Sequence, residues 1–218
     1  MSGKLIVLEG LDGSGKSTQL ELLRSRLEGE VRYVKFPAYE SESSALVRMY
    51  LGGEFGTKPS DVNAYAASAF YAVDRYASFK TDWGEAYRSG ATVVCDRYTT
   101  SNAVHQASKL CGEDRDRYLD WLYDFEFAKL GIPRPDAVVF LDMPIAVSQR
   151  LMSGRYNGDE GKKDIHERDT AYLEHCREAA LYAAERLGWS VILCSDGDRV
   201  RSREDIANDV FNVVSEIL

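Results

Sequence analysis

The chain has 218 residues and a formal net charge of −8, with 44% hydrophobic and 28% charged side chains. This composition is typical of a globular protein of one domain and excludes disordered, collagen-like and fibrous proteins. The longest apolar run, at 179–184, has six residues, whereas a membrane span needs roughly 20. Because the N-terminus also lacks a signal-peptide pattern, we expect a cytoplasmic protein without membrane contact. The acidic charge argues against sequence-independent nucleic-acid binding, which depends on Lys and Arg.

Five short apolar segments predict the strands, in the order 5–8, 31–36, 91–95, 137–141 and 191–194. They are almost continuously apolar, as parallel strands buried on both faces are. The stretches between them are long enough for crossover helices. The pattern predicts a doubly wound α/β fold, with a five-stranded parallel sheet and helices on both faces.

Helices are predicted at 18–27, 62–87, 111–129 and 164–187; in the last of these an apolar stripe ends at Gly188. The segment 153–163 contains three glycines and three cations, so we expect a mobile loop there. Its functional interpretation is a lid over an anionic ligand, at about 153–164; the alternative is a surface loop without a role. No linker or repeat is visible, so 1–218 is expected to be a single domain.

The cysteines Cys95, Cys111, Cys176 and Cys194 form no C-x-x-C pair. We therefore expect neither a zinc site nor a redox centre. Cys95, Cys176 and Cys194 are expected to be small buried hydrophobic residues with reduced thiols.

The strongest motif is G-x-x-x-x-G-K-[ST], which follows a strand and precedes a helix, the context that identifies a P-loop. Its residues are Gly10, Leu11, Asp12, Gly13, Ser14, Gly15, Lys16 and Ser17, followed by Thr18. Glycines allow backbone N–H groups to surround phosphates, Lys16 adds a point charge, and Ser17 offers a hydroxyl to Mg²⁺. The motif predicts a site for a nucleoside triphosphate.

Polar residues also follow the second and third predicted strands. Open α/β sheets bind ligands outside the carboxyl ends of their strands. Asp96 can therefore reach the Mg²⁺ shell, and Arg97 can bind a phosphate with two hydrogen bonds. The alternative is a surface ion pair near the start of a helix.

Together these motifs resemble bacterial thymidylate kinases, P-loop kinases that phosphorylate dTMP to dTDP with MgATP. The matching landmarks run in the family's order: 9–18, Phe36-Pro37, Asp74-Arg75, Asp96-Arg97-Tyr98, Ser101-Asn102, 135–142 and 164–167. The resemblance implies a homodimer, with the helices after residue 60 as the contact.

The resemblance also implies roles for individual residues. Asp12 would face the acceptor sugar and hold the phosphate-binding Arg97, and Tyr71 would stack on thymine. Arg75 would hydrogen-bond a thymine carbonyl. The other acceptor-site residues are Phe36, Tyr39 near the ribose, and Asn102 and Gln106 at the base and sugar edge. For Tyr71 the alternative is core packing, and His105 is interpreted as structural.

On the donor side, the resemblance assigns Arg150 to adenine and Arg155, helped by Lys162 and Lys163, to the phosphoryl group in transfer. A solvent-facing arginine is the alternative for Arg150. Lys16, Arg97, Arg155 and Asp12 are thus the expected catalytic residues. The chain departs from many relatives at Ala38, where a basic residue is common, and the P-loop contains no arginine.

Three other functions are open from sequence. A kinase of the same fold could act on another nucleoside or monophosphate. A GTPase switch is disfavoured, because no Asn-Lys-x-Asp motif occurs and no Asp-x-x-Gly follows the P-loop. An ATP-binding module without turnover is disfavoured by the intact Lys16, Ser17, Asp96 and Arg97.

Overall fold

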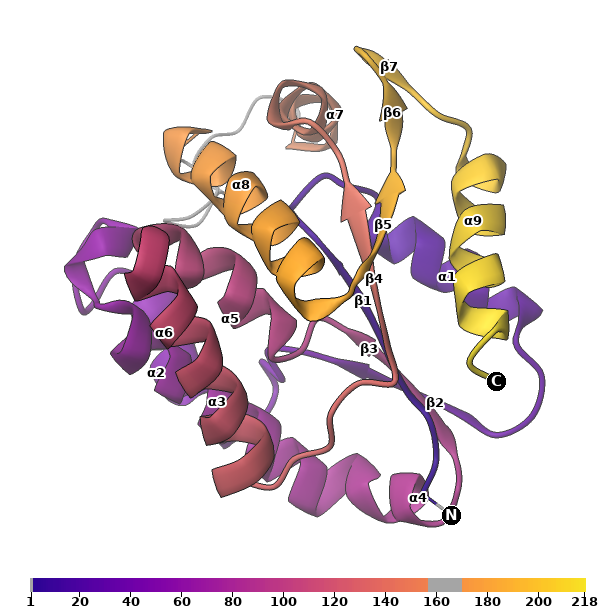
Figure 1. Ribbon diagram of the computed structural model, residues 1–218, viewed down its shortest axis with the longest axis horizontal. Helices are drawn as coiled ribbons and strands as arrows, with labels where there is room; N and C mark the ends of the chain where they lie inside the picture. Colours follow the sequence, from indigo (N-terminus) through magenta and orange to yellow (C-terminus); the bar gives the residue numbers. More distant parts are fainter. Residues whose placement is uncertain (1, 157–169) are drawn as a thin grey trace.

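A five-stranded parallel sheet lies at the centre of the computed structural model, which describes residues 2–156 and 170–218 (Figure 1). The strand order is β2-β3-β1-β4-β5. The strands are β1 (Leu5–Gly10), β2 (Val31–Lys35), β3 (Thr92–Asp96), β4 (Ala137–Asp142) and β5 (Ser190–Leu193). All five predicted strands are confirmed.

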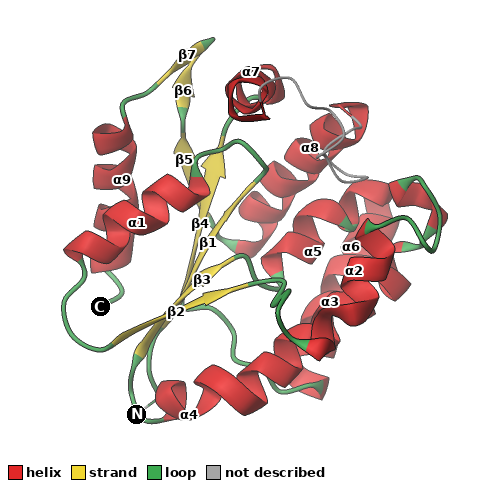
Figure 2. Ribbon diagram, turned by 180° about the vertical axis from the view of Figure 1, so that it is seen from behind, coloured by secondary structure: helices red, strands yellow, loops and turns green. Residues whose placement is uncertain are grey.

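Helices cover both faces of this sheet (Figure 2), which confirms the predicted doubly wound α/β fold. One face carries α1 (Lys16–Arg26) and α9 (Arg203–Ser215). The other face carries α3 (Ala64–Ser78), α5 (Thr100–His105), α6 (Gly112–Tyr123) and α8 (Thr170–Leu187). The remaining α-helices are α2 (Ala45–Leu51), α4 (Gly84–Arg88) and α7 (Ile145–Tyr156).

The sheet separates two hydrophobic cores. Successive side chains of a strand point to opposite faces, so Leu5 and Val7 pack into the core under α8, while Ile6 and Leu8 pack into the core under α1 and α9. This arrangement explains why the strand is apolar at consecutive positions. Packing on both faces holds β1 in place, and with it the carboxyl end of the strand, where the P-loop begins.

The two long predicted helices, 62–87 and 111–129, are interrupted. A π-helical turn at Phe79–Trp83 joins α3 to α4, and another at Asp124–Lys129 follows α6. A Cβ on Gly84 would lie 2.1 Å from the Phe79 carbonyl oxygen, so the first turn requires glycine there. Turns of this kind often occur at functional sites.

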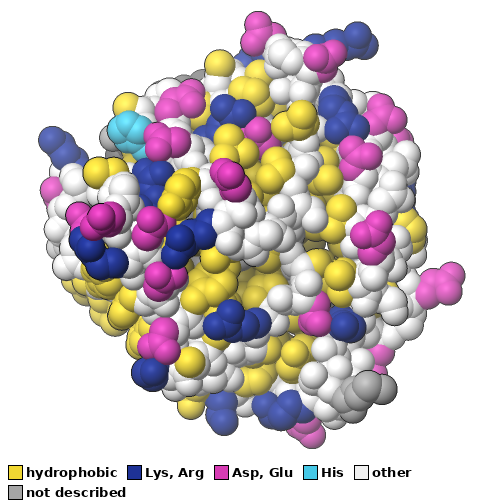
Figure 3. Space-filling view, in the orientation of Figure 1, with side chains coloured by type: hydrophobic (Ala, Val, Ile, Leu, Met, Phe, Trp, Pro, Cys, Tyr) yellow, Lys and Arg dark blue, Asp and Glu magenta, His cyan; other side chains and the backbone are white. Residues whose placement is uncertain are grey.

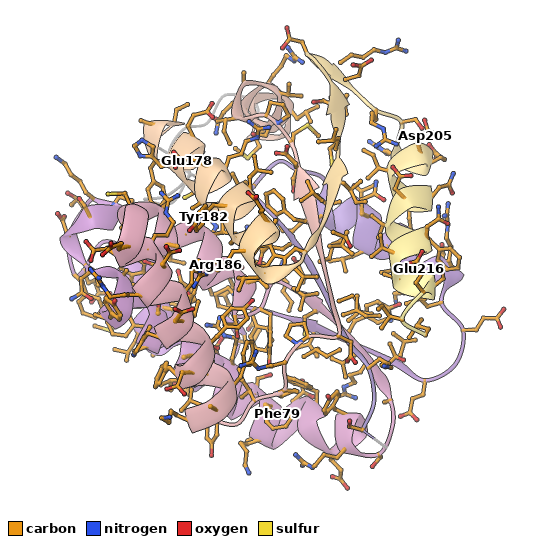
Figure 4. All side chains as sticks on the ribbon, in the orientation of Figure 1. Phe79, Glu178, Tyr182, Arg186, Asp205 and Glu216 are labelled. Carbon is orange, nitrogen blue, oxygen red and sulfur yellow. The ribbon has the colours of Figure 1, made fainter. Side chains whose placement is uncertain are left out.

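Polar contacts join the outer face of α8 to α6. Figure 4 shows Glu178, Tyr182 and Arg186 along one side of α8, toward α6. Glu178 accepts a hydrogen bond of 3.1 Å from Arg115, Tyr182 donates to Asp116, and Arg186 donates to Asp120 at 2.8 Å. Exposed pairs of this type add little stability individually, so they mainly fix how α8 lies against α6.

The expected loop at 153–163 is partly wrong, because α7 continues to Tyr156. Gly154 is tolerated inside this helix at a cost of about 1 kcal/mol, and no stronger break precedes Asn157-Gly158. Residues 157–163 lie outside the described residues, as do 164–169 of the predicted helix 164–187.

A two-stranded antiparallel hairpin, β6 (Ser195–Asp196) and β7 (Arg199–Val200), follows β5 and was not predicted. Its turn contains Gly197 with φ +55°. The two residues between the strands are Gly197 and Asp198, and a Gly-Asp pair between short strands is a known hairpin signal. The hairpin delivers the chain to α9 beside the P-loop.

The described cysteines are all free thiols, and Cys95, Cys176 and Cys194 are buried as predicted. Within the described ranges, every helix is too short or too polar to cross a bilayer.

Candidate active site

The P-loop connects β1 to α1 at the carboxyl edge of the sheet. Its turn is closed by a hydrogen bond of 3.1 Å from the Ser14 amide to the Leu11 carbonyl. Gly15 precedes α1 in the left-handed region, at φ +89°, which few other residues adopt without strain. The first backbone N–H groups of a helix have no acceptor within that helix, so the start of α1 supplies donors that can bind an anion.

A cavity of about 540 Å³ lies over this turn, hereafter the P-loop cavity. The predicted ATP-site residues that line it are Asp12, Gly13, Ser14, Gly15, Lys16, Ser17 and Thr18. Gly10 and Leu11 lie beneath them, and their carbonyl oxygens accept hydrogen bonds from Lys16 Nζ at 2.6 and 3.3 Å. The cavity is large enough for a nucleotide.

Lys16 is buried, and its environment disfavours the charged ammonium form. Burial, followed by the charge of Arg97, lowers the pKa of Lys16 to about 8, although the charges of Asp12 and Glu9 oppose this shift. A bound polyphosphate would add negative charge beside Lys16 and so favour its protonated form. Within the described residues, the ammonium donates its hydrogen bonds to the backbone carbonyl oxygens of Gly10 and Leu11.

Ser17 and Asp96 form the candidate metal site. Both line the P-loop cavity. Asp96 Oδ1 is buried, and no hydrogen-bond partner occurs for it within the described residues; Oδ2 lies 3.7 Å from Lys35 Nζ. No cluster of three or more His, Cys, Asp or Glu side chains in the described ranges could hold a metal alone. These donors fit Mg²⁺, which prefers oxygen ligands and usually completes its shell with phosphates and water.

Arg97 lies directly after β3 and points between two carboxylates. Its backbone has φ +70°, a strained conformation of the kind that clusters at functional sites. Arg97 Nη2 donates to Asp12 Oδ1 at 2.7 Å, and Nη1 donates to Glu9 Oε1 at 3.3 Å. Burial alone would raise the pKa of Asp12, but the charges of Arg97 and then Lys16 outweigh it and hold that pKa below its usual value.

Glu9 is a positioning residue that sequence analysis missed. Its side chain is fully buried, and Oε2 accepts hydrogen bonds from the Thr100 and Ser101 hydroxyls, both at 2.7 Å. Because Oε1 also receives Arg97, Glu9 ties the start of α5 to the guanidinium. A charged residue at the end of the apolar run 5–8 was the available signal.

A second cavity, of about 390 Å³, adjoins the P-loop cavity, with Asp12, Lys35 and Arg97 lining both. All of the residues that the resemblance assigned to the acceptor line it, namely Asp12, Phe36, Tyr39, Tyr71, Arg75, Arg97, Asn102 and Gln106. They come from five separate chain segments. Their convergence makes this cavity the candidate acceptor site.

Arg75 is held by a buried glutamate, Glu126, which sequence analysis also missed. Arg75 Nε lies 2.7 Å from Glu126 Oε2, and Nη2 lies 2.5 Å from Oε1. Burial alone would lower the pKa of Arg75, but the adjacent Glu126 carboxylate raises it above its ordinary value. Glu126 also accepts hydrogen bonds from Thr99 at 2.7 Å and Asn102 at 3.3 Å. A carboxylate between Phe125 and Phe127 was the signal.

Gln106 and Tyr71 offer complementary surfaces in the second cavity. Both amide atoms of Gln106 are buried, and neither has a hydrogen-bond partner in the part of the chain that the structure describes. A buried unpaired amide is costly, so its presence in a cavity wall points to a polar ligand. Tyr71 contacts Tyr50 edge to face, with ring centroids 6.4 Å apart, and so supplies a fixed aromatic wall.

His105, interpreted from sequence as structural, also lines the second cavity. Its Nε2 lies 3.3 Å from Arg97 Nη1, and its Nδ1 lies 3.6 Å from Cys176 Sγ. His105 therefore lies between Arg97 and Cys176 of α8 and contacts both.

Of the predicted donor arginines, the structure describes the side chain of Arg150 alone, and it is not brought to the cavities. Arg150 is exposed and donates a hydrogen bond of 2.6 Å to the Asp198 carbonyl oxygen; it lines neither cavity. Other residues of α7, and residues of the segment 200–206, do line the P-loop cavity, namely Leu151, Met152, Val200, Arg201, Arg203 and Ile206. The side chains of Arg155, Lys162 and Lys163 lie outside the described residues.

Comparisons with known proteins agree with this geometry. The family model described as "Thymidylate kinase" matches residues 8–202. A thymidylate kinase of Mycobacterium tuberculosis is 34% identical over 184 residues, which cover 82% of this chain and 84% of that protein. A probable thymidylate kinase of Pyrococcus horikoshii is 31% identical over 222 residues, with 100% and 98% coverage. A solved thymidylate kinase structure from Candida albicans superposes with a TM-score of 0.74 at 18% identity, over 99% of this chain and 92% of that one.

Proposed function

The chain belongs to the thymidylate kinase family, and we propose that its two cavities hold the two substrates of that reaction. The enzyme is an ATP-dependent nucleoside monophosphate kinase that phosphorylates dTMP to dTDP. The P-loop cavity is the ATP site, and the second cavity is the dTMP site. The observation that carries this assignment is the shared boundary of the cavities at Asp12, Lys35 and Arg97.

On the donor side, the amides of the P-loop and the start of α1 bind the β- and γ-phosphates. Lys16 turns from the Gly10 and Leu11 carbonyls toward the γ-phosphate. Ser17 and Asp96 would hold Mg²⁺, which would supply positive charge to offset the negative charge of the phosphates. Adenine lies toward Arg201 and Val200, whereas Arg150 lines neither cavity and donates to the Asp198 carbonyl oxygen.

On the acceptor side, thymine lies against Tyr71 and Phe36, and Arg75 donates to a carbonyl of the base. Arg75 donates hydrogen bonds from Nε and Nη2 to the Glu126 carboxylate. These two bonds fix the plane of the guanidinium, and therefore the directions of its remaining N–H bonds. Gln106 supplies the amide that no described protein group satisfies. Asn102 reads the base edge, and Tyr39 borders the ribose. Asp12 faces the sugar and orients Arg97.

The chemical step requires little covalent work from the protein. An oxygen of the acceptor phosphate attacks the γ-phosphorus, the bond to the bridging oxygen breaks, and ADP leaves with that electron pair. Arg97 and Lys16 stabilise the negative charge on the phosphoryl oxygens. Binding of both substrates at fixed positions also brings the reacting atoms into line, which lowers the barrier further.

We propose further that the enzyme is of the bacterial type, because the P-loop contains no arginine and Arg155 stands in the proposed lid segment 153–164. The lid would exclude water, which otherwise accepts the phosphoryl group. The whole chain, 1–218, would act as one kinase domain in the cytoplasm.

A homodimer is the proposed assembly. Tyr65, Val73 and Tyr76 are 40%, 51% and 40% exposed on α3 and occupy one side of that helix. Apolar side chains grouped in this way often mark a protein contact. Contact through α3 would also brace Arg75, which lies on the same helix.

Nucleic acid is not an expected partner. On the face of the described chain seen in Figure 3, Lys and Arg side chains are interspersed with Asp and Glu. That face presents no extended positive region for a phosphate backbone.

The activity is tested by measuring ADP release from MgATP with dTMP, dUMP, thymidine, dCMP, AMP or no acceptor. We expect dTMP to be turned over well above the others. Preference for thymidine would show that the phosphate assignment at Arg97 is wrong. Release of ADP at the same rate without an acceptor would place the protein among hydrolases or switches.

A further inference from the structure

Lys35 is the one residue of the shared boundary that has no role in the account above. It ends β2 and lies in register with Asp96 on β3, at the carboxyl edge of the sheet. Asp12 and Arg97, the other residues common to both cavities, contact each other directly at 2.7 Å. Lys35 therefore stands where the phosphates of the two substrates must meet.

The other cations of the second cavity are already bound to carboxylates. Arg75 is paired with Glu126, and Arg97 is paired with Asp12 and Glu9. For Lys35, the carboxylate oxygen paired with it in the described chain is Asp96 Oδ2, at 3.7 Å, which is beyond hydrogen-bonding distance. Its side chain is 68% exposed. The ammonium can therefore turn toward an incoming anion without breaking a hydrogen bond to a carboxylate.

The adjoining loop cannot supply this charge. Ala38 has no polar side chain, and its backbone N–H already donates to Asp74 Oδ2 at 2.8 Å. Asp74 accepts a second hydrogen bond from Ser43 at 2.6 Å, so the loop is held in place. A cation on this side of the cavity must come from the end of β2.

We propose that Lys35 binds the 5′-phosphate of the acceptor nucleotide. This inference rests on the proposed function, since it assigns one more group to the dTMP site. A lysine ammonium is a compact point charge on a flexible stem, and such a group can follow a phosphate as it approaches the γ-phosphate. Lys35 thus selects monophosphates over nucleosides, together with Arg97.

The test compares the affinities of dTMP and thymidine by calorimetry, in the native protein and in Lys35→Ala and Lys35→Arg. The two ligands differ by the phosphate, so their ratio isolates its contacts. We expect Lys35→Ala to weaken dTMP binding about tenfold and to leave thymidine binding within about twofold. Lys35→Arg should retain most of the dTMP affinity.

Lys4→Ala is the matched control, because Lys4 pairs with Asp136 at 3.2 Å at the opposite edge of the same sheet. It should change neither affinity. Equal losses for dTMP and thymidine, or no loss for either, would overturn the inference, as would weaker ATP binding with unchanged dTMP binding. If the native protein phosphorylates no dTMP, the proposed function itself fails, a result separate from any effect of Lys35→Ala.

Discussion

The P-loop cavity takes its phosphate-binding turn from eight consecutive residues, 10–17, whereas the second cavity is assembled from segments as distant as Asp12 and Gln106. The first binds chiefly through backbone N–H groups, which any residue that fits the turn provides. The second depends on charged side chains held by buried carboxylates, Glu9 and Glu126. A single substitution can thus remove chemistry from the backbone site without losing the fold, whereas removal of one partner from a buried ion pair lowers both binding and stability.

The largest expected effect is on the donor side. Lys16→Ala should lower kcat by roughly 10³-fold, because one preorganised donor to the transferring group is removed. The melting temperature should stay close to that of the native protein, since Lys16 pays a desolvation cost in the folded state. Steady-state rates and thermal unfolding measure both quantities. A variant that unfolds at room temperature would contradict the assigned contrast between the two cavities.

In the second cavity the effect should fall on stability. Glu126→Ala leaves the buried Arg75 guanidinium without its partner, so we expect the free energy of unfolding to fall by about 3–4 kcal/mol. The double variant Arg75→Met with Glu126→Leu removes both charges and should recover most of that loss. It should nevertheless fail to bind dTMP. Chemical denaturation and calorimetry provide the measurements; normal dTMP affinity in the double variant would exclude Arg75 from base recognition.

At Gln106 we expect a substitution to raise stability while it weakens substrate binding. Its amide has no described protein partner, so Gln106→Met should raise the free energy of unfolding by about 1–2 kcal/mol. The KM for dTMP should rise about tenfold, because a ligand hydrogen bond is lost. Asn63→Met is the contrasting variant: it removes the side chain that caps α3, so it should lower the free energy of unfolding by about 1 kcal/mol and leave the KM for dTMP unchanged. A more stable variant with unchanged KM would mean that Gln106 does not contact the substrate.

A smaller effect is expected from pH. The unliganded Lys16 has its pKa lowered to about 8 by burial and by Arg97, and ATP binding favours the protonated form. Above pH 8 binding must take up a proton, so ATP affinity should fall about tenfold between pH 7 and pH 9. Binding of dTMP serves as the internal comparison. Calorimetry in buffers of different ionisation enthalpy would detect the proton; a flat profile would contradict the lowered pKa.

The same contrast explains what could be predicted from sequence. The sheet was predictable because its strands are apolar at consecutive positions, and the P-loop because its chemistry is contiguous. Glu9, Glu126 and Lys35 were not assigned, since their partners lie far away in the chain, as with Arg75 and Glu126, which are 51 positions apart. The hairpin β6–β7 and the extension of α7 to Tyr156 were not predicted. Both depend on short local sequence patterns, which are weaker than the patterns of the longer strands and helices.

The acceptor-site residues taken from the resemblance converge on one cavity, whereas the donor arginine does not. Arg75, Tyr71 and Asn102 lie on elements packed against the sheet, so their neighbours determine their directions. Arg150 lies on the exposed side of α7, where the unpredicted hairpin offers it a carbonyl oxygen instead. The residues named from the resemblance thus converge where burial fixes the side chain, and their roles stay predictions.

The central claim is that the two substrates meet at Asp12, Lys35 and Arg97, and a crystal structure with dTMP and a non-hydrolysable ATP analogue tests it most directly. We expect the dTMP phosphate at this boundary, within hydrogen-bonding distance of Arg97, and thymine against Arg75 and Gln106. A monophosphate bound away from this boundary, or a base that contacts neither Arg75 nor Gln106, would contradict it.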